Sequence, residues 1–338
     1  MTSPSRGIRL RSSARSDRGR VRQNNEDSVH LWGEEHNVLA VVADGMGGAV
    51  AGEEASRIAI ETIQDKLTSG AHRKAEDYEH YEGDELGELM GDAVREANLN
   101  IIAKAHTKPE LRGMGTTVTM VFARQNDVVL AHVGDSRAYY IDSLDSSIRQ
   151  LTEDHTFVQA LLKAGHISAE EAEHHPMGNV LYRALGQAED LDVEVKTSIQ
   201  LHMGDRLLLC SDGLTLHVDA DEIADICLDY DDPTEISDQL IDLALKRGGK
   251  DNVSVIVICV DDVRQEDKVD AETESALLQF DSVQTDEAPT VPMNQDFFNV
   301  TRKKSSNDST DHLSSSSQPL NEYNTIYGEG RDAFEPLQ

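Results

Sequence analysis

The sequence predicts an α+β domain in which antiparallel β-sheets are covered by helices. Short aliphatic runs typical of buried strands recur through about the first 260 residues. Long segments with helical spacing separate the first two of these runs. Strands and helices do not alternate strictly, and most successive strands are close enough in sequence to form hairpins. This order favours antiparallel sheets over a parallel, doubly wound sheet.

The predicted strands are runs of five to eight residues that are rich in Val, Ile and Leu. Runs of this length suit strands that are buried on both faces, because a helix needs a longer segment. A shorter apolar stretch at residues 29–32 precedes the first of them. The five runs span residues 38–43, 118–123, 128–133, 206–210 and 253–260.

Four helices are predicted from the spacing of the apolar residues. Residues 53–67 open with acids and place Ala55, Ile60 and Ile63 along one side. Residues 86–105 repeat apolar residues at the same spacing. Two further helices are predicted over residues 220–228 and 233–246.

The composition divides the chain of 338 residues into one domain and two termini. We predict a disordered N-terminus over residues 1–6 and a folded domain over residues 7–262, long enough to bury a stable core. Residues 263–338 are acidic and rich in Ser and Asn without sustained periodicity, which predicts a flexible tail. Two interpretations of the tail stay open: an inert solvated linker, or a regulatory segment that binds a kinase or a phosphothreonine-binding adaptor.

Charge and cysteine content restrict the class of protein. The net charge of −32 argues against nucleic acid as a partner, because phosphates require an excess of Lys and Arg. No segment reaches the run of about 18 apolar residues that a membrane span needs, so we expect no membrane partner. Cys210, Cys227 and Cys259 form no CxxC pair and lie beside aliphatic residues. Free thiols in a reducing compartment, the cytoplasm, are therefore predicted.

Acidic residues stand at one end of most predicted strands. A single Asp after a strand is an ordinary turn signal. Several such loops at one end of a sheet would bring their carboxylates together. The cluster would then repel itself unless cations neutralised it, and hard divalent ions with oxygen ligands are the natural occupants. The acids concerned are Glu26, Asp27, Asp44, Asp135, Asp212 and Asp251.

Eight motifs around these acids follow one another within about residues 14–260. In this order they resemble the metal-dependent protein phosphatases of the protein phosphatase 2C type, particularly the compact bacterial members. The resemblance implies a central sandwich of two antiparallel sheets flanked by helices, with a metal site in a cleft at one end and a flap, about residues 152–186, beside it. The motifs are Ser16-Asp17-Arg18-Gly19-Arg20-Val21-Arg22 with Asn25-Glu26-Asp27, Val42-Ala43-Asp44-Gly45-Met46-Gly47-Gly48, Met114-Gly115-Thr116-Thr117, Val133-Gly134-Asp135-Ser136-Arg137, Leu151-Thr152-Glu153-Asp154-His155, Asn179-Val180-Leu181-Tyr182-Arg183-Ala184-Leu185-Gly186, Cys210-Ser211-Asp212-Gly213-Leu214 and Asp251-Asn252-Val253-Ser254.

The same resemblance assigns metal ligands. Asp44 matches the carboxylate that bridges two Mn²⁺ or Mg²⁺ ions, and the backbone carbonyl of Gly45 matches a further ligand. Asp212 and Asp251 match the remaining ligands of this binuclear centre. Asp135 matches a residue of a third, weaker metal site that Asp212 would share.

Three further residues are assigned around the metals. Asp27 is a metal ligand and Glu26 its outer neighbour, and this pair acts mostly through metal-bound waters. Arg22 matches the arginine that grips the substrate phosphate, a task that suits its planar guanidinium. Arg22, Asp44 and Asp212 are therefore the predicted catalytic residues. Thr116 and Thr117 are β-branched residues at the start of a strand, and we assign them to packing.

The resemblance implies hydrolysis of phosphoserine and phosphothreonine on proteins by a metal-activated water, opposing a cognate serine/threonine kinase. Many eukaryotic relatives carry a His, the proposed proton donor to the leaving group, where this chain has Met46. A metal-bound water is the preferred donor here, with His155 as an alternative. Two other functions stay open: a catalytically silent module that binds phosphoproteins or regulates a kinase, and a phosphatase dedicated to one partner-switching regulator.

Overall fold

The computed structural model describes residues 8–68, 78, 81–173 and 175–262. The predicted disordered N-terminus and the predicted tail over residues 263–338 lie outside the described residues. The domain limits, the disorder and the role of the tail therefore stay predictions.

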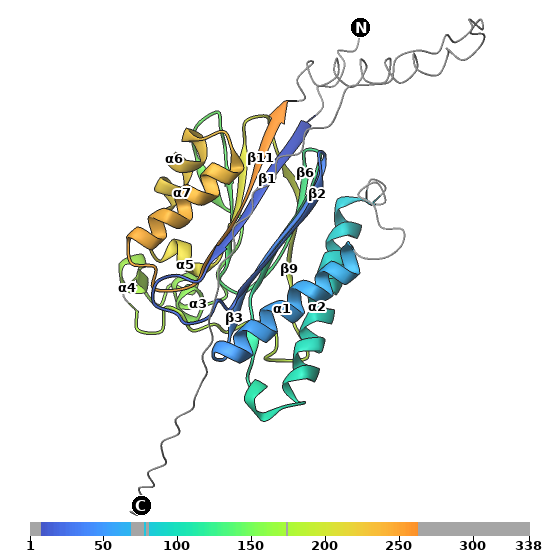
Figure 1. Ribbon diagram of the computed structural model, residues 1–338, viewed down its shortest axis with the longest axis vertical. Helices are drawn as coiled ribbons and strands as arrows, with labels where there is room; N and C mark the ends of the chain where they lie inside the picture. Colours follow the sequence, from blue (N-terminus) through green and yellow to red (C-terminus); the bar gives the residue numbers. More distant parts are fainter. Residues whose placement is uncertain (1–7, 69–77, 79–80, 174, 263–338) are drawn as a thin grey trace, which may run out of the picture. The chain divides into compact units, whose positions relative to one another are not determined.

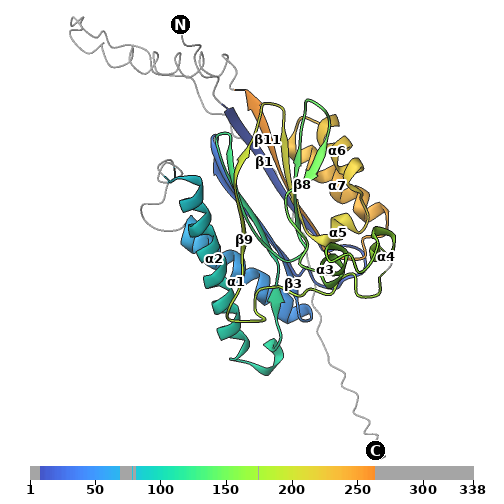
Figure 2. The same ribbon diagram turned by 180° about the vertical axis from the view of Figure 1, so that it is seen from behind.

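Two antiparallel sheets form the centre of the domain, as the resemblance implies (Figures 1 and 2). Every pairing between neighbouring strands is antiparallel. The first sheet has the order β1 (Ile8–Asp17), β11 (Val253–Asp262), β10 (Arg206–Cys210), β7 (Arg137–Ile141) and β8 (Ile148–Gln150). The second has the order β2 (Asp27–Glu34), β3 (Asn37–Met46), β5 (Val118–Arg124), β6 (Asp127–Val133) and β9 (Glu194–Gln200), with the short β4 (Gly115–Thr116) paired to the end of β3.

Helices cover the outer face of each sheet (Figure 1). Helices α1 (Ala49–Leu67) and α2 (Gly83–Ala105) lie on the second sheet, and the 3-10 turn η2 (Pro109–Leu111) follows α2. The first sheet is covered by α5 (Asp212–Thr215), α6 (Ala220–Asp229) and α7 (Pro233–Lys246). The predicted flap contains α3 (Phe157–Lys163) and α4 (Ala169–Glu173).

Strand β3 shows why its sequence is continuously apolar. Side chains alternate between the two faces of a strand. Leu39, Val41 and Ala43 therefore join the core beneath α1 and α2, whereas Val38 and Val42 face the other sheet. Because both faces of β3 are buried, the sequence shows no polar alternation. The strand carries Asp44 at its end, so it fixes that carboxylate to the most deeply packed part of the domain.

The predicted strands and helices are all present. The helix predicted to begin at residue 53 begins at Ala49 instead. The residue before it, Gly48, is the N-cap and has a φ of 91°. Six strands were not predicted as strands: β1, β2, β4, β7, β8 and β9. The apolar stretch at residues 29–32 lies within β2. None of the described helices is both long and apolar enough to cross a membrane.

Candidate active site

A cleft of about 330 Å³ lies where strands of both sheets end. Four of the five predicted aspartates line it: Asp44 near the end of β3, Asp135 after β6, Asp212 after β10 and Asp251 before β11. These acids are far apart in the sequence, and the antiparallel order of the strands brings them together. A larger groove of about 680 Å³ beside β8 and β9 has Asp142 as the single acid in its lining, so it is not the predicted site.

The other predicted residues lie in or beside the same cleft. Arg22, Glu26 and Gly45 line it. Asp27 is buried, with 8% of its surface exposed, and is not part of the lining. The predicted flap contributes Asn179 and Leu181 to the lining of the cleft.

Two serine hydroxyls that sequence reasoning missed hold the carboxylate of Asp27. Ser211 Oγ and Ser254 Oγ donate hydrogen bonds of 2.8 and 2.7 Å to Asp27 Oδ2. Asp27 Oδ1 is buried and finds no donor within the described part of the chain. A buried carboxylate oxygen without a donor is costly, and it is free to accept a proton, a water or a cation.

Thr116 and Thr117 do more than the packing predicted for them. The backbone N–H of Asp44 donates to Thr117 Oγ1 at 3.0 Å, and the Asp44 carbonyl accepts from Thr116 Oγ1 at 2.8 Å. The N–H of Thr117 donates to the same carbonyl at 2.9 Å. Both threonines are buried, as packing requires. Their bonds also fix the backbone from which the Asp44 carboxylate projects, so they position Asp44 as well.

Asn252 anchors the loop that carries Arg22. Its Oδ1 accepts from the backbone N–H of Glu26 at 2.8 Å. Its Nδ2 donates to the carbonyls of Arg18 and Asn24 at 2.8 and 2.9 Å. The sequence signal for this role is limited to the position of Asn252 directly after Asp251. One buried amide therefore joins the loop of residues 18–26 to the loop that carries Asp251.

The guanidinium of Arg22 is the cation nearest to these acids in the lining of the cleft. Its Nη2 lies 2.7 Å from Asp251 Oδ2, and its Nη1 lies 3.8 Å from Glu26 Oε1. The side chain is 47% exposed. It can therefore exchange this pairing for another anion that enters from solvent.

Burial and mutual repulsion raise the pKa values of the acids in this cluster. Burial, with a smaller contribution from Asp212, raises the pKa of Asp27 to about 7 despite its two serine donors. Burial, followed by repulsion from Asp27, raises the pKa of Asp44 well above its ordinary value. Burial raises the pKa of Asp135 to about 7 and that of Asp212 to about 6, with repulsion from Asp212 and Asp251 respectively as the next cause.

These features fit divalent metal ions. The protein atoms alone do not stabilise the fully ionised cluster at neutral pH, so it must bind protons or cations. The donor set of carboxylates and a backbone carbonyl is the set that Mg²⁺ and Mn²⁺ prefer over softer metals. Asp27 Oδ1 is a buried acceptor without a donor, which further indicates that the negative charge of the site lacks a positive partner among the described residues.

The structure contradicts His155 as the alternative proton donor. Its ring is 3% exposed and does not line the cleft. Met46 does line the cleft, where its thioether has no proton to give. Neither side chain can therefore protonate a leaving group at this site.

Comparisons with known proteins identify the family. The family model described as "Protein phosphatase 2C" matches residues 17–245. The serine/threonine protein phosphatase PstP of Mycobacterium tuberculosis (strain H37Rv) is 43% identical over 254 residues, which is 75% of this chain and 45% of PstP. The serine/threonine phosphatase stp of Listeria monocytogenes (strain EGD-e) is 38% identical over 252 residues, 74% of this chain and 95% of that protein.

Solved structures give the same result. The solved structure of the PstP catalytic domain in complex with two manganese ions superposes on this chain with a TM-score of 0.62 and 39% sequence identity. The match covers 75% of this chain and 100% of the PstP catalytic domain. The chain spans less than half the length of full PstP, so the likeness concerns the phosphatase domain. The order of the motifs, the sandwich of two sheets and the matched residues 17–245 agree, and the chain belongs to the protein phosphatase 2C family.

Proposed function

We propose that this chain hydrolyses phosphoserine and phosphothreonine esters on proteins, at a binuclear Mn²⁺ or Mg²⁺ centre in the cleft. The observation that carries the proposal is the convergence of four carboxylates from separate strands on one cleft. The names of the relatives support it, because they are serine/threonine phosphatases, and one solved relative carries two manganese ions.

The residues of the cleft would divide between the metals and the substrate. Asp44, Asp212 and Asp251 with the carbonyl of Gly45 would hold the two ions. Asp135 would bind a third ion at a weaker site. Asp27 and Glu26 would contact the ions mostly through metal-bound waters. When bound, such ions supply positive charge to the phosphoryl oxygens and lower the pKa of a coordinated water.

The chain's own side chains would bind and orient the substrate. The Arg22 guanidinium can leave Asp251 and bind two phosphoryl oxygens in parallel, because its fork matches their spacing. Thr116 and Thr117 hold Asp44 rigidly while charge develops on the phosphoryl group. We assign protonation of the leaving oxygen to water in the cleft, since neither Met46 nor His155 can supply it.

We further propose a catalytic domain of residues 7–262, a cytoplasmic location and a serine/threonine kinase as the opposing enzyme. Support for these finer points comes from the free, buried thiols Cys210, Cys227 and Cys259 and from the bacterial relatives.

The test is hydrolysis of a phosphothreonine peptide with Mn²⁺, with Mg²⁺ and with chelator. Asp212→Asn keeps the size of the side chain and removes a ligand, so we expect turnover to fall at least about 100-fold. Asp92→Asn, on the exposed surface of α2, is the matched control and should retain full turnover. A folded protein that binds Mn²⁺ but never turns over would instead favour a module that binds phosphoproteins.

A further inference from the structure

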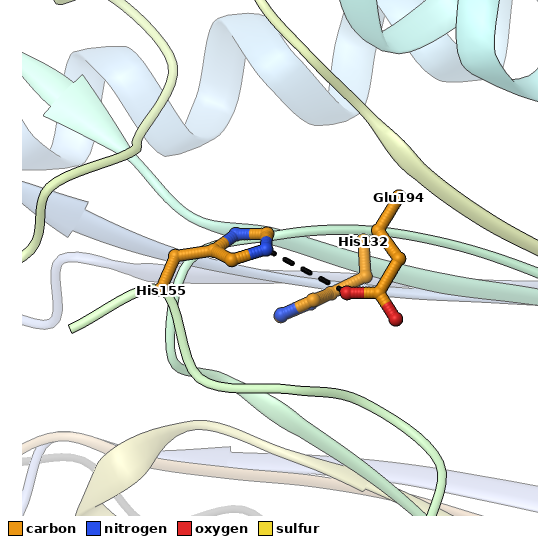
Figure 3. Close-up of side chains that lie close together, drawn as sticks. All are labelled: His132, His155 and Glu194. Carbon is orange, nitrogen blue, oxygen red and sulfur yellow. Dashed lines mark ion pairs between the residues drawn. The ribbon is translucent and has the colours of Figure 1, made fainter. Parts of the chain in front are cut away.

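The side chains of His132, His155 and Glu194 meet inside the domain (Figure 3). They come from β6, from the start of the flap and from β9. One ligand atom from each lies within 4.8 Å of the others. Two imidazoles and a carboxylate form a common zinc set, so this cluster is either a second metal site or a hydrogen-bonded support.

The hydrogen bonds of His155 decide between these alternatives. The backbone N–H of Gly134 donates to His155 Nδ1 at 3.0 Å. An N–H group can only donate, so Nδ1 carries the lone pair and Nε2 carries the proton of the ring. Nε2 faces Glu194 Oε2 at 3.6 Å (Figure 3). A protonated Nε2 is a donor and cannot be a metal ligand.

The carboxylate of Glu194 supports this tautomer. Glu194 lies directly opposite His132 in the β6–β9 pairing, and its Oε1 lies 2.8 Å from Lys196 Nζ. His155 and Lys196 lower the pKa of Glu194 to about 2, so its carboxylate is ionised. Arg183 Nη1 also lies 3.3 Å from Nε2, and because a guanidinium only donates, this contact alone would favour a lone pair on Nε2. A neutral ring has only one acceptor nitrogen, and the Gly134 bond to Nδ1 is the shorter of the two at 3.0 Å, so we assign the lone pair to Nδ1.

His132 is also fully used by the protein. Its Nε2 lies 3.1 Å from the carbonyl of Glu153 and donates to it, and its Nδ1 lies 2.9 Å from Thr119 Oγ1. The ring is completely buried and stacks on His155 with centroids 4.9 Å apart. A metal at this position would have to break one of these bonds.

Two consecutive residues, Asp154 and His155, hold the turn that carries Asp135. The His155 N–H donates to the Gly134 carbonyl at 2.8 Å, which adds a second bond to the one at Nδ1. Asp154 accepts from Arg137 through Nη2 at 2.7 Å and Nε at 3.0 Å. Asp135 lies between these two attachment points.

We propose that His155 is a positioning residue that fixes the Gly134–Asp135 turn, with Glu194 holding its ring in the required tautomer. The proposal rests on the proposed function in one respect, that Asp135 binds the weaker metal ion. His155 acts through Gly134 and touches neither substrate nor metal. This role gives His155 a function in place of the proton donation that its burial contradicts.

The first measurement is made on the metal-free full-length protein and needs no activity. Nitrogen chemical shifts of His155 should report the proton on Nε2. Exchange of the Gly134 amide should accelerate about tenfold in His155→Ala, since one hydrogen bond is lost. It should return toward the wild-type rate in His155→Asn, because Asn Oδ1 can occupy the place of Nδ1. His106→Asn, on the exposed end of α2, is the control and should leave Gly134 unchanged.

The second measurement is Mn²⁺ binding by calorimetry. Loss of a residue that holds a metal ligand in place typically lowers metal affinity 10–100-fold. We therefore expect the affinity of the weakest Mn²⁺ site to fall about tenfold in His155→Ala and to recover partly in His155→Asn. The tight steps should keep their affinities. An unchanged weak step beside accelerated Gly134 exchange would overturn the positioning role.

Three other results would overturn the proposal. One is a proton on Nδ1, and another is unaltered Gly134 exchange in His155→Ala. The third is an extra equivalent of bound Zn²⁺ that disappears in both His155→Asn and Glu194→Gln, which would make the cluster a metal site. A wild-type protein that binds no Mn²⁺ at all would contradict the proposed function instead, while the exchange experiment would still test the role of His155 at Gly134.

Discussion

Asp27 on β2 lies directly opposite Asp44 on β3 in the antiparallel pairing of these strands. Like charges in this position repel each other and destabilise a sheet. Both residues are largely shielded from water, so the repulsion acts in a medium that screens it poorly. A bound cation would change this repulsion into two attractions, and the stability of the domain should therefore depend on pH and metal together.

Without metal, the domain should lose stability as the pH rises from about 4 to 7. Burial raises the pKa values of Asp27 and Asp135 to about 7 in the folded state, far above their unfolded values. The folded protein therefore binds more protons than the unfolded chain across this interval, and stability falls with rising pH. A pKa change of one is about 1.4 kcal/mol, and 1 kcal/mol changes Tm by about 2–4 °C at this size.

The measurement is thermal unfolding at pH 5 and pH 8, with chelator and with Mn²⁺. We expect the Tm with chelator to be at least about 5 °C lower at pH 8 than at pH 5, and Mn²⁺ to remove most of the difference. Burial lowers the pKa of His132 to about 4, so His132 makes the folded state less stable as the pH falls and opposes the effect of the aspartates. Its contribution is the same with and without Mn²⁺ at one pH, so it cancels in that comparison. Equal Tm values with and without Mn²⁺ at pH 8 would contradict the interpretation.

Replacing Ser254 by Ala should weaken metal binding without unfolding the domain. The change removes one of two hydroxyl donors to Asp27 Oδ2, and hydrogen bonds to the ionised form keep a carboxylate pKa low. We expect the Mn²⁺ concentration for half-maximal turnover to rise about tenfold. Ser237→Ala is the matched control, since Ser237 on α7 is equally buried and its hydroxyl bonds to Ser13 and to the Pro233 carbonyl, not to an acid. If both variants need the same Mn²⁺ concentration, Ser254 does not contribute to metal binding.

Replacing Arg22 by Lys should reduce kcat/KM for a phosphothreonine peptide by about 10–100-fold. A lysine keeps the charge but loses the two parallel N–H groups that match a phosphoryl group. The loss should be larger in Arg22→Ala. Arg95→Lys, on the surface of α2, gives the matched change where the side chain pairs with Asp92. If Arg22→Lys has the kinetics of Arg95→Lys, Arg22 serves only to neutralise Asp251.

Gly213 should tolerate no side chain. A Cβ at this position would stand 1.9 Å from the carbonyl oxygen of Asn252, whose backbone cannot withdraw without moving Asp251. We expect Gly213→Ala to cost at least about 2 kcal/mol of unfolding free energy in urea titrations. Gly83→Ala is the control, because its Cβ meets its nearest neighbour at 3.6 Å in the first turn of α2. That change should be neutral or stabilise by about 0.4–1 kcal/mol.

Much of this fold was predictable because its central strands are apolar on both faces. Strand β10 was predicted to the residue, since the run 206–210 is completely buried. Strand β1 was missed because it lies at the edge of its sheet and is mostly half-buried, so its sequence of Arg and Ser shows no apolar run. Strand β9 is likewise an edge strand, with exposed positions along its length.

The candidate site divides in a similar way. The acids could be predicted because several of them follow apolar runs, and the motifs agreed with a known family. The groups that hold them could not be predicted, because Ser211, Ser254 and Asn252 are ordinary turn residues in the sequence. Only the three-dimensional pairing shows that their polar atoms point to residues more than 180 positions away. His155 was misjudged for the same reason, since burial is a property of the folded chain.

The pairing of β1 with β11 joins the first and last strands of the described domain, with Asp17 opposite Val253. Asp251, just before β11, is among the last of the cleft residues to be synthesised. A nascent chain therefore cannot assemble the complete cleft until about residue 262 has left the ribosome and β11 has inserted between β1 and β10. Contacts of such long range form late in folding. Every copy of the chain that ends before residue 251 therefore lacks one of the four aspartates of the cleft, and the proposed site is completed only when the last strand of the domain has been synthesised.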